Sequence, residues 1–356
     1  MFKKLFTLFQ LGRKVAKSEI LSVTSKFQKP PLAIIILFKI LSFSFSEKKQ
    51  VDMNKSEGER LSNSLESMGT TFIKLGQFLA TRPDIIGEDL SKQLENLQDK
   101  LPPFSLLQAK EIIKNDLGED TYNSIIDLSE PVAAASIAQV HKAQINDGGT
   151  IKDVAIKILR PNIKKIFNEE IDAIMLFAFL IESFIKKTKR LKLVEVVFLL
   201  KEITNLEMDL RFEAAAANEY AENTKNDVGF RVPQIYWNFT SENVMTLDWV
   251  DGISIRETQE LKNRNFNTEK IAEDIIQNFL RHAVRDGFFH ADMHQGNIFI
   301  DTDGQIVPID FGIMGRLDKM SKRFLAEILF GFIQRDYRKV AEVHLVAGLV
   351  PKEVPI

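Results

Sequence analysis

Three oxygen-bearing side chains in the stretch 290–312 have the types and spacing that phosphate chemistry needs. Asp292 stands in a tight loop, where it can orient or deprotonate a hydroxyl group. Asn297, five residues later, and Asp310 are oxygen donors of the kind that Mg²⁺ prefers. Between them, two short apolar runs flank the turn residues 302–304, which predicts a hairpin. We expect this hairpin to bring the three side chains to the same end, at the opening of one cleft.

The order of these residues, His-x-Asp-x-x-x-x-Asn followed by Asp-Phe-Gly, is that of the catalytic and metal-binding loops of the protein-kinase fold. An Asp-Phe-Gly triplet alone is a weak signal. The two loops in this order, and this close together, are a strong one. The sequence therefore predicts phosphoryl-transfer chemistry supported by Mg²⁺.

A second group of candidates lies upstream of these loops. The segment 154–157, Val-Ala-Ile-Lys, resembles the strand whose lysine holds the α- and β-phosphates of a nucleotide and pairs with a helical glutamate. An inward-facing ammonium group needs such a partner, and Glu213, ahead of an alanine run that favours helix, is our candidate for Lys157. Without the lysine strand, Glu213 and the nearby Glu207 and Asp209 would be read as ordinary solvated helix acids.

Apolar periodicity predicts the elements that must position these groups. The expected elements are strands at 132–143 and 154–159 with a hairpin turn at 146–149, long helices over 165–226, strands around 234–238 and 244–247, an amphipathic helix over 268–286 and helices over 318–348. The last helices are expected to bury one apolar face made of Phe324, Leu325, Ile328, Leu329, Phe332 and Ile333.

The strand at 244–247 is expected to lead into a hinge before Asp251 and Gly252. Backbone groups of a hinge can hydrogen-bond an adenine base. The candidates for that role are Thr246, Leu247, Asp248 and Trp249.

A Lys-Leu-Gly-Gln run interrupts an apolar segment near the start of the chain. Lys74 and Gln77 are three residues apart, so they share a helix face. Gly76 inside a helix costs about 1 kcal/mol relative to alanine, which indicates close packing at that point. On the pattern alone, Lys74 would be read as a solvated surface lysine.

Composition excludes several functional classes. The 356 residues include no cysteine, so disulfides and thiol chemistry are excluded, and the five histidines form no metal-ligand cluster. There is no G-x-x-x-x-G-K-[ST] run for a Walker-type site, and no stripe of aromatic and basic residues that would indicate nucleic acid.

The formal charge of −2 hides an asymmetry. Residues 1–50 carry ten Lys and Arg against two acidic residues, so the remainder carries −10. Residues 1–15 have an amphipathic pattern. The apolar run 32–45 contains Lys39 and falls short of the roughly 20 residues of a membrane span, so we expect an interfacial or protein-packed helix. Residues 171–185 are expected to form a core helix. The basic, apolar end suits a membrane surface or an acidic partner.

Protein kinases cover the phosphates with a glycine-rich loop ahead of the lysine strand. Alanine adds a Cβ atom and restricts the close approach and positive φ angles that glycine allows. A nucleotide would therefore meet a different phosphate geometry in this chain, whose corresponding residues are Ala133, Ala134, Ala135 and Ser136.

Taken together, these motifs resemble the UbiB family of atypical kinase-like proteins tied to ubiquinone (coenzyme Q) biosynthesis, over residues 56–356. The resemblance rests on K-L-G-Q at 74–77, the alanine-rich loop, the V-A-I-K lysine, E-x-D at 207–209, Glu213 with Asn218, and the two loops ending in Asp-Phe-Gly.

The resemblance implies an α+β, protein-kinase-like two-lobed fold with an N-terminal helical extension and an incomplete C-lobe. In the family, the lysine and glutamine of the extension reach into the cleft and are held by the E-x-D acids, which implies pairing of Lys74 and Gln77 with Glu207 and Asp209. The implied ligands are ATP or ADP with Mg²⁺, and the implied activity is that of an ATPase or a small-molecule or lipid kinase.

The implied setting is the cytoplasmic face of a bacterial inner membrane, as a peripheral protein. Its implied partners are membrane lipids or isoprenoid quinone precursors and quinone-biosynthesis proteins, with a homodimer allowed. The expected division is 1–50 as the membrane-associating segment, 51–128 as the helical extension, 129–250 as the N-lobe with inserted helices, and 251–356 as a truncated C-lobe.

Three departures from the family pattern stand out. Met293 and Gln295 replace two prolines of the usual catalytic loop. The sequence stops about 45 residues after Asp310, where family members continue, and membrane attachment would then depend on 1–45. The alanine loop and the short C-terminus favour an alternative, a non-catalytic nucleotide- and lipid-binding scaffold. An aminoglycoside- or choline-type kinase would share the loops but would not explain the K-L-G-Q helix.

Overall fold

The computed structural model describes residues 56–94, 97, 101–184, 189 and 191–350, so the helices expected at 1–15 and 32–45 lie outside the described residues. The chain divides into two compact units, each built from separate segments. The first unit takes in Met1–Ile112, Glu130–His141 and Lys157–Met208, and the second Ile113–Ser129, Lys142–Ile156 and Asp209–Ile356. The division into four consecutive segments, made from the sequence, stays a prediction.

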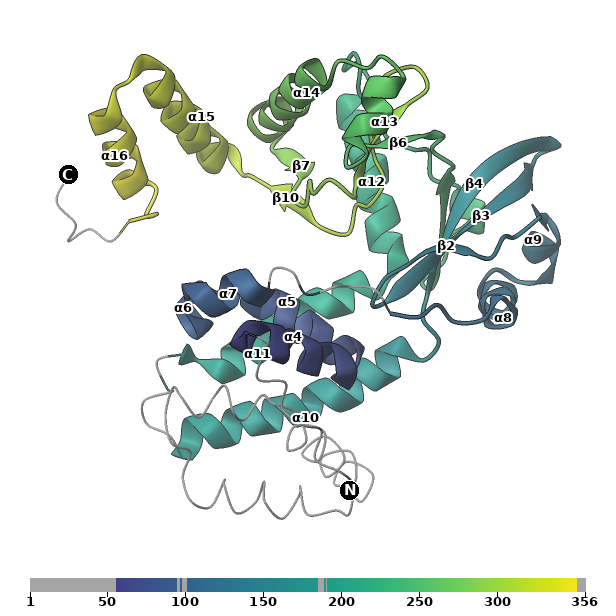
Figure 1. Cartoon of the computed structure of the whole chain (residues 1–356), viewed down its shortest axis with the longest axis horizontal. Coiled ribbons are helices and arrows are strands. Elements are labelled where there is room, and N and C mark those ends of the chain that lie inside the picture. The colour runs from purple at the N-terminus through teal and green to yellow at the C-terminus, as the bar shows by residue number, and fades with distance from the viewer. Residues whose placement is uncertain (1–55, 95–96, 98–100, 185–188, 190, 351–356) are drawn as a thin grey trace. The chain divides into compact units, whose positions relative to one another are not determined.

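Helices form most of the described first unit (Figure 1): α4 (Glu57–Met68), α5 (Thr70–Ala80), α6 (Pro83–Ile86), α7 (Glu88–Leu94), α10 (Ile163–Phe184) and α11 (Leu193–Glu207). A capping box starts α4, in which the Ser56 hydroxyl accepts the Glu59 N–H and the Glu59 carboxylate accepts the Ser56 N–H. The helix ends at Gly69, whose φ of 107° is open to glycine at little cost. α5 begins directly afterwards.

The apolar faces of α4, α5, α7 and α10 meet in one core. α10 packs along α11, and both contact α5. None of the described helices combines the length and apolarity that a bilayer span requires. The shared core contains Leu61, Leu65, Met68, Phe72, Ile73, Leu94, Leu97 and Ala173.

Gly76 confirms the close packing expected on α5. A Cβ atom at this position would lie 2.8 Å from Leu65 Cδ1 and 3.3 Å from Leu97 Cδ2. The glycine therefore lets helix α5 approach its neighbours inside this core.

An antiparallel sheet joins strands in the order β1-β3-β4-β5, with β2 paired to β3. Its strands are β1 (Ile125–Ile126), β2 (Pro131–Ala134), β3 (Ala138–Asp147), β4 (Thr150–Leu159) and β5 (Val244–Asp248). The division between the units runs through β3 and β4. Gly148 and Gly149 both have positive φ, which suits the predicted tight hairpin turn. Helices α8 (Leu106–Leu117) and α9 (Glu119–Asn123) precede the sheet.

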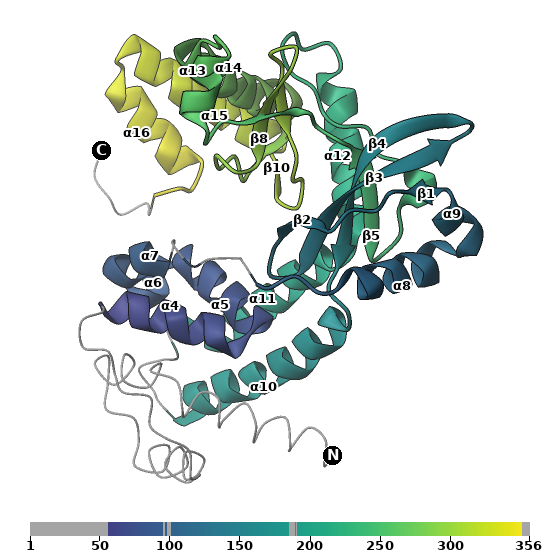
Figure 2. The same cartoon turned by 45° about the vertical axis from the view of Figure 1, so that its right-hand side comes forward.

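The second unit continues with α12, which packs beside β5 (Figure 2). Two small sheets follow, in the orders β6-β8-β9 and β10-β7. The predicted hairpin is confirmed, with Ile298 opposite Pro308 and Ile300 opposite Ile306. The elements are α12 (Leu210–Thr224), β6 (Gly252–Ser254), α13 (Thr258–Asn263), α14 (Thr268–Arg281), the π-helical turn η3 (His282–Asp286), β7 (Phe288–His290), β8 (Ile298–Asp301), β9 (Ile306–Pro308), β10 (Met314–Arg316), α15 (Lys319–Gln334) and α16 (Tyr337–Val346).

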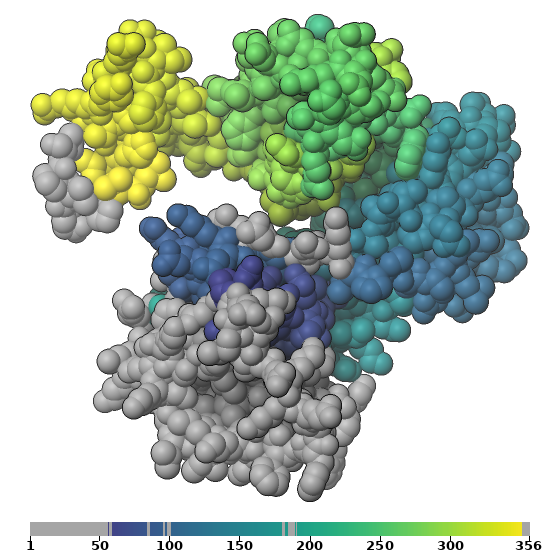
Figure 3. Space-filling view, in the orientation of Figure 1, coloured from purple at the N-terminus to yellow at the C-terminus, as the bar shows by residue number. Residues whose placement is uncertain are grey.

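Two expectations about this unit were wrong. The strand at 234–238 is replaced by a single bridge, Ile235 to Leu247, and a 3₁₀ turn, η2 (Trp237–Phe239). The buried face of the last helices fails at Phe332 and Ile333, which are 53% and 75% exposed. In the described part of the chain, α15 packs on α16 and η3 and leaves this end open, and Figure 3 shows α15 and α16 (yellow) projecting from the rest of the unit.

The packing at Gly76 predicts a stability effect. Gly76→Val should lower the free energy of unfolding in urea by about 2 kcal/mol, because the new methyl groups overfill the space beside Leu65. Asn63→Val, which places the same residue at an exposed position of α4, is the control and should cost less than about 0.7 kcal/mol. Equal losses for the two variants would contradict the account of Gly76.

Candidate active site

The imidazole of His290, 1% exposed, joins the two loops predicted to carry the chemistry. Its Nε2 lies 2.6 Å from the Asp310 carbonyl oxygen, and its Nδ1 accepts the Asp292 N–H at 3.1 Å. Burial lowers the pKa of His290, so the ring is neutral, with Nε2–H as the donor to Asp310. One uncharged ring therefore fixes the backbone of both loops.

Asn297 fixes the loop that contains Asp292 from inside. Its side-chain Nδ2 donates to the Asp292 carbonyl at 3.2 Å and reaches the Asp292 carboxylate at 3.4 Å. Its own carbonyl accepts the Ile309 N–H at 3.0 Å, next to Asp310 in the chain. The side chain is buried, and this orientation leaves its Oδ1 available to a cation. These contacts bring the backbone at Asp310 next to Asn297 and Asp292, and the meeting of the three side chains stays a prediction.

Helix α12 contacts the Asp-Phe-Gly segment and the strand that follows it. The buried Glu213 accepts the Phe311 N–H at a long 3.4 Å. Two turns further on, Glu219 forms a two-pronged ion pair with Arg316 of β10, at 2.8 Å between Oε1 and Nη1. Hydrogen bonding to Arg316 lowers the pKa of Glu219. The helix carrying the candidate lysine partner is therefore fastened to the Asp-Phe-Gly segment and to the strand after it.

A buried polar chain anchors the same helix to η3. The Tyr220 hydroxyl lies 2.7 Å from His282 Nδ1, and His282 Nε2 lies 2.9 Å from Asp227 Oδ2. Burial lowers the pKa of His282 and raises that of Tyr220, so a neutral ring accepts from the tyrosine and donates to the carboxylate. The contact between His282 and Asp227 is thus a hydrogen bond from a neutral ring to a carboxylate. Its length alone would fit an ion pair equally well. Hydrogen bonds from Arg285 are the main cause of the lowered pKa of Asp227.

In the first unit, Lys74 and Glu207 meet as the family resemblance implied. Lys74 Nζ lies 2.8 Å from Glu207 Oε2, and the two side chains are 16% and 15% exposed. The angles at these atoms are not those of a hydrogen bond, so the contact is electrostatic. Lys74 is therefore mostly buried, which excludes a solvated surface lysine. Its catalytic role, and that of Gln77 on the same helix, stay predictions.

The roles predicted for Asp209, for Lys157 with Glu213 and for the alanine-rich loop are not tested by the contacts within either unit. Asp209 caps α12, where its carboxylate accepts the Arg211 N–H at 3.2 Å and the Arg211 side chain at 2.9 and 2.7 Å. Its pairing with Gln77, and that of Lys157 with Glu213, would join the two units, and both stay predictions. The alanine-rich loop begins at the end of β2, with Ala133 opposite Val140 and Ala134 opposite Gln139.

The predicted hinge is largely occupied by sheet contacts. The N–H of Asp248 donates to Gln234, and that of Trp249 donates to Asp153, both at 3.0 Å. The N–H of Thr246 donates to the Thr240 hydroxyl at 3.3 Å. These N–H groups are engaged within the chain, and the adenine role of Thr246, Leu247, Asp248 and Trp249 stays a prediction.

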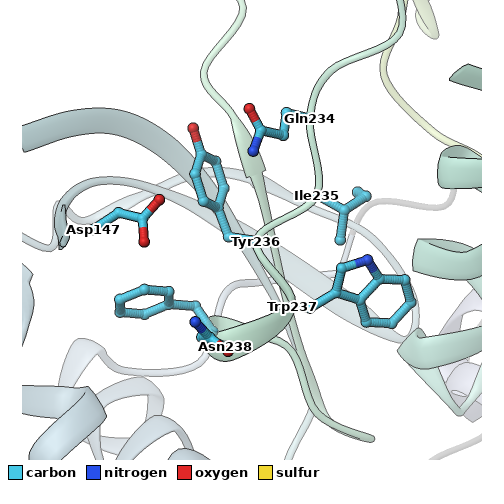
Figure 4. Close-up of a pocket in the computed structure, with 7 residues that line it drawn as sticks. Asp147, Gln234, Ile235, Tyr236, Trp237 and Asn238 are labelled. Atoms are coloured by element: carbon cyan, nitrogen blue, oxygen red, sulfur yellow. The ribbon is translucent and has the colours of Figure 1, made fainter. Parts of the chain in front are cut away.

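A small cavity next to this predicted hinge is too small to hold a nucleotide. Its volume is about 170 Å³, below the roughly 300 Å³ at which ligand pockets begin. No predicted site residue lines it. Its walls, shown in Figure 4, are Asp147, Gln234, Ile235, Tyr236, Trp237, Asn238 and Phe239.

Sequence reasoning gave no role to several groups that hold the site. His290 was present in the loop motif, and the protein-kinase pattern was the signal that could have marked it. Glu219 and Arg316 lie 97 residues apart and carry no motif, so nothing in the sequence paired them.

The chain is similar to known proteins over most of its length. Residues 96–344 match the ABC1 atypical kinase-like domain. A probable protein kinase UbiB of Marinobacter nauticus is 38% identical over 306 residues, which cover 85% of this chain and 55% of that protein. The namesake of Pseudomonas fluorescens is 33% identical over 355 residues, 98% of this chain and 65% of that protein. The chain thus spans about half to two thirds of the length of these relatives.

A solved structure, that of a Mycobacterium tuberculosis protein in complex with erythromycin, covers 84% of this chain and 75% of its own. The TM-score is 0.57 and the sequence identity 24%, so the likeness shows a shared fold. Together these findings show the predicted mixed α and β, kinase-like fold.

The Lys74–Glu207 contact predicts energetic coupling. Lys74→Met or Glu207→Gln alone should cost about 1–2 kcal/mol of unfolding free energy, because each removes one charge of a mostly buried pair and with it the attraction to the other charge. The double variant should recover about 1 kcal/mol of the summed cost in urea denaturation.

The matched control is Lys201 with Asp172, an ion pair of the same unit whose side chains are 30% and 46% exposed. Its coupling should stay below about 0.5 kcal/mol. Equal coupling in the two cycles would show that burial adds nothing to the Lys74 pair.

The lowered pKa values of His282 and His290 predict acid sensitivity. Near and below the ordinary histidine pKa of 6.5, these two histidines bind protons in the unfolded chain but stay neutral in the folded chain. The free energy of unfolding therefore falls as the pH drops through that value. Each ring should contribute a slope of up to about 1.4 kcal/mol per pH unit. His282→Gln should remove one such contribution in urea melts between pH 7 and pH 5.

Thr224→Val is the control, since it removes a buried polar group of α12 that does not titrate. It should lower stability equally at every pH. A pH slope unchanged in His282→Gln would contradict the neutral state of that ring.

Proposed function

The chain belongs to the ABC1 family of atypical kinase-like proteins, and from this premise we propose that it binds ATP or ADP with Mg²⁺ and acts as an atypical kinase or ATPase in ubiquinone biosynthesis. The observation that supports the proposal is the His290 junction, in which the ring contacts the backbone of Asp292 and of Asp310 while Asn297 contacts Asp292.

Each residue has a definite part in this proposal. Asp292 positions the attacking water or hydroxyl group and accepts its proton. Lys157, oriented by Glu213, contacts the phosphates, as the family pattern implies. Lys74 and Gln77, with the acids at Glu207 and Asp209, restrict access to the cleft. Phosphoryl transfer depends mostly on positioning and charge neutralisation, which such groups supply.

The donor set fits Mg²⁺. Asn297 Oδ1 is left available by the hydrogen bonds of its Nδ2 group, and one oxygen of the Asp310 carboxylate, Oδ1, accepts the Gly312 N–H at 3.1 Å within its own segment. One amide and one carboxylate are few ligands, which suits an ion that completes its shell with phosphate oxygens and waters. When bound, Mg²⁺ would neutralise phosphate charge. No group of three or more acidic or histidine side chains forms a self-sufficient metal site among the described residues.

The proposed setting is the cytoplasmic face of a bacterial inner membrane. Ten basic residues against two acidic ones in 1–50 would be attracted to anionic lipid, and the apolar run 32–45 would add interfacial contact. The proposed partners are isoprenoid quinone precursors in that membrane and other quinone-biosynthesis proteins. The chain could bind them as a monomer or as a homodimer.

A scaffold without turnover is the second candidate. The alanine-rich loop favours it, since the Cβ atoms of Ala133, Ala134 and Ala135 oppose the backbone approach to phosphate that glycine permits. Such a protein would bind nucleotide and lipid and hydrolyse nothing.

Nucleotide binding tests the proposal. Asp310→Asn should weaken Mg²⁺-dependent ATP binding at least tenfold in calorimetry, a loss of about 1.4 kcal/mol or more. Asp303→Asn, which removes an exposed carboxylate from the turn of the same hairpin, should leave affinity unchanged. Equal affinity for wild type and Asp310→Asn would sink the assignment of the metal site.

Phosphate release separates the two candidates. Wild-type protein with Mg²⁺, anionic liposomes and a phenolic quinone precursor should release phosphate from ATP, and Asp292→Asn should be slower by about 100-fold or more. Tight ATP binding with no release under any of these conditions would establish the scaffold.

A further inference from the structure

Arg160 lies three residues beyond Lys157, between the end of β4 and the start of α10. Its side chain donates to three backbone carbonyls in two distant segments. Nε and Nη2 donate to Ala135 at 3.0 and 2.8 Å, Nη1 donates to Pro102 at 2.9 Å, and Nη2 also donates to Leu101 at 3.2 Å. One half-buried guanidinium group therefore ties the alanine-rich loop to the segment 101–104.

The geometry requires arginine. A guanidinium group presents five N–H donors in a fixed plane, whereas a lysine ammonium is a single point on a flexible stem. Only a forked donor can reach Ala135 with one edge and the 101–104 segment with another. The main-chain N–H of Arg160 adds a bond to Ile137 at 2.8 Å, so the residue grips the loop from both backbone and side chain.

Two further contacts hold the same parts together. Gln139, 1% exposed, accepts the Phe104 N–H at 2.9 Å and donates to the Phe104 carbonyl at 3.2 Å. The Thr70 hydroxyl, in the first turn of α5, donates to the Ser136 carbonyl at 3.2 Å. The alanine-rich loop is thus fastened to segment 101–104 on one side and to the Lys-Leu-Gly-Gln helix on the other.

The segment 101–104 is itself anchored in the helical extension. The side chain of Leu101 packs against the core formed by α4, α5 and α7. A movement of these helices would displace Leu101 and, through the hydrogen bonds of Arg160, also Ala135. The alanines of the loop lack the backbone freedom of glycine, so the loop would move with Ala135 instead of changing its conformation.

We infer that Arg160, assisted by Gln139, is a positioning residue that makes the alanine-rich loop follow the helical extension, so that the state of the extension sets the affinity for nucleotide. The role in nucleotide affinity rests on the proposed function. The mechanical link between loop and extension does not, because every contact that forms it lies within the first unit.

Amide hydrogen exchange tests the link in the full chain without nucleotide. In Arg160→Met, the amides of both Ala135 and Phe104 should exchange about tenfold faster, because each is held by a bond inside the clamped region. Arg160→Lys keeps the charge but loses the fork, so it should resemble Arg160→Met. Arg264→Met is the control, since Arg264 is an arginine of the second unit that pairs with Glu260 of α13 and has no part in the proposed site, and it should leave both exchange rates unchanged.

Faster exchange at Ala135 with unchanged exchange at Phe104 would overturn the inference, since the arginine would then only shape the loop. Unchanged exchange at both amides would overturn it equally. If Arg160→Met does not fold, Arg160→Lys decides by the same criterion.

Calorimetry connects the link to nucleotide. Arg160→Met should bind Mg²⁺–ATP about tenfold more weakly than wild type, and Arg264→Met should bind normally. In wild type, saturating nucleotide should also slow exchange at Phe104, and in Arg160→Met this effect should vanish. Wild type that binds no nucleotide would remove the proposed function, while the exchange rates would still decide the link. Undiminished affinity in Arg160→Met would overturn the effect on nucleotide.

Discussion

The site depends on a single neutral imidazole buried between two loops. Because the pKa of His290 is lowered by burial, the ring has one donor and one acceptor, and each is used on a different loop backbone. A protonated ring would have two donors and would lose its bond from the Asp292 N–H. The placement of Asp292 relative to Asp310 therefore follows from the charge state of a residue that itself does no chemistry.

The surrounding elements make that junction rigid. Glu219 and Tyr220 of α12 engage Arg316 and His282, so the helix that presents Glu213 is tied to the segments on either side of the loops. In the first unit the same principle recurs: Lys74 is held by a mostly buried carboxylate, and backbone carbonyls are gathered by one arginine. Buried polar groups are costly unless each has a partner, so these contacts specify one arrangement of the backbone.

The sequence predicted what depends on local chemistry. Residue types at fixed spacings predicted the hairpin between Asn297 and Asp310, the two-glycine turn after β3 and the close packing at Gly76. The family pattern predicted the partner of Lys74. It could not predict contacts whose acceptors are backbone carbonyls, such as those of Arg160, since a carbonyl has no sequence signature.

Tertiary packing also decided where local patterns failed. Apolar residues around 234–238 fit a strand by periodicity, but only one bridge to β5 forms and the chain turns into 3₁₀ geometry. Phe332 and Ile333 fit a buried helical face, yet burial requires a neighbour, and the described neighbours of α15 leave that end uncovered. Periodicity reports which residues could be buried together, and the fold determines whether anything covers them.

If Asn297 and Asp310 form a metal–nucleotide centre, paramagnetic Mn²⁺ in place of Mg²⁺ should bind there in the presence of ADP. Nuclear magnetic resonance of the amide-labelled chain should then show strongest line broadening at the Asn297 side-chain NH₂ and at the backbone amides of Phe311 and Gly312. The broadening should require the nucleotide and disappear in Asp310→Asn. Broadening centred on other residues, or identical with and without ADP, would contradict the account.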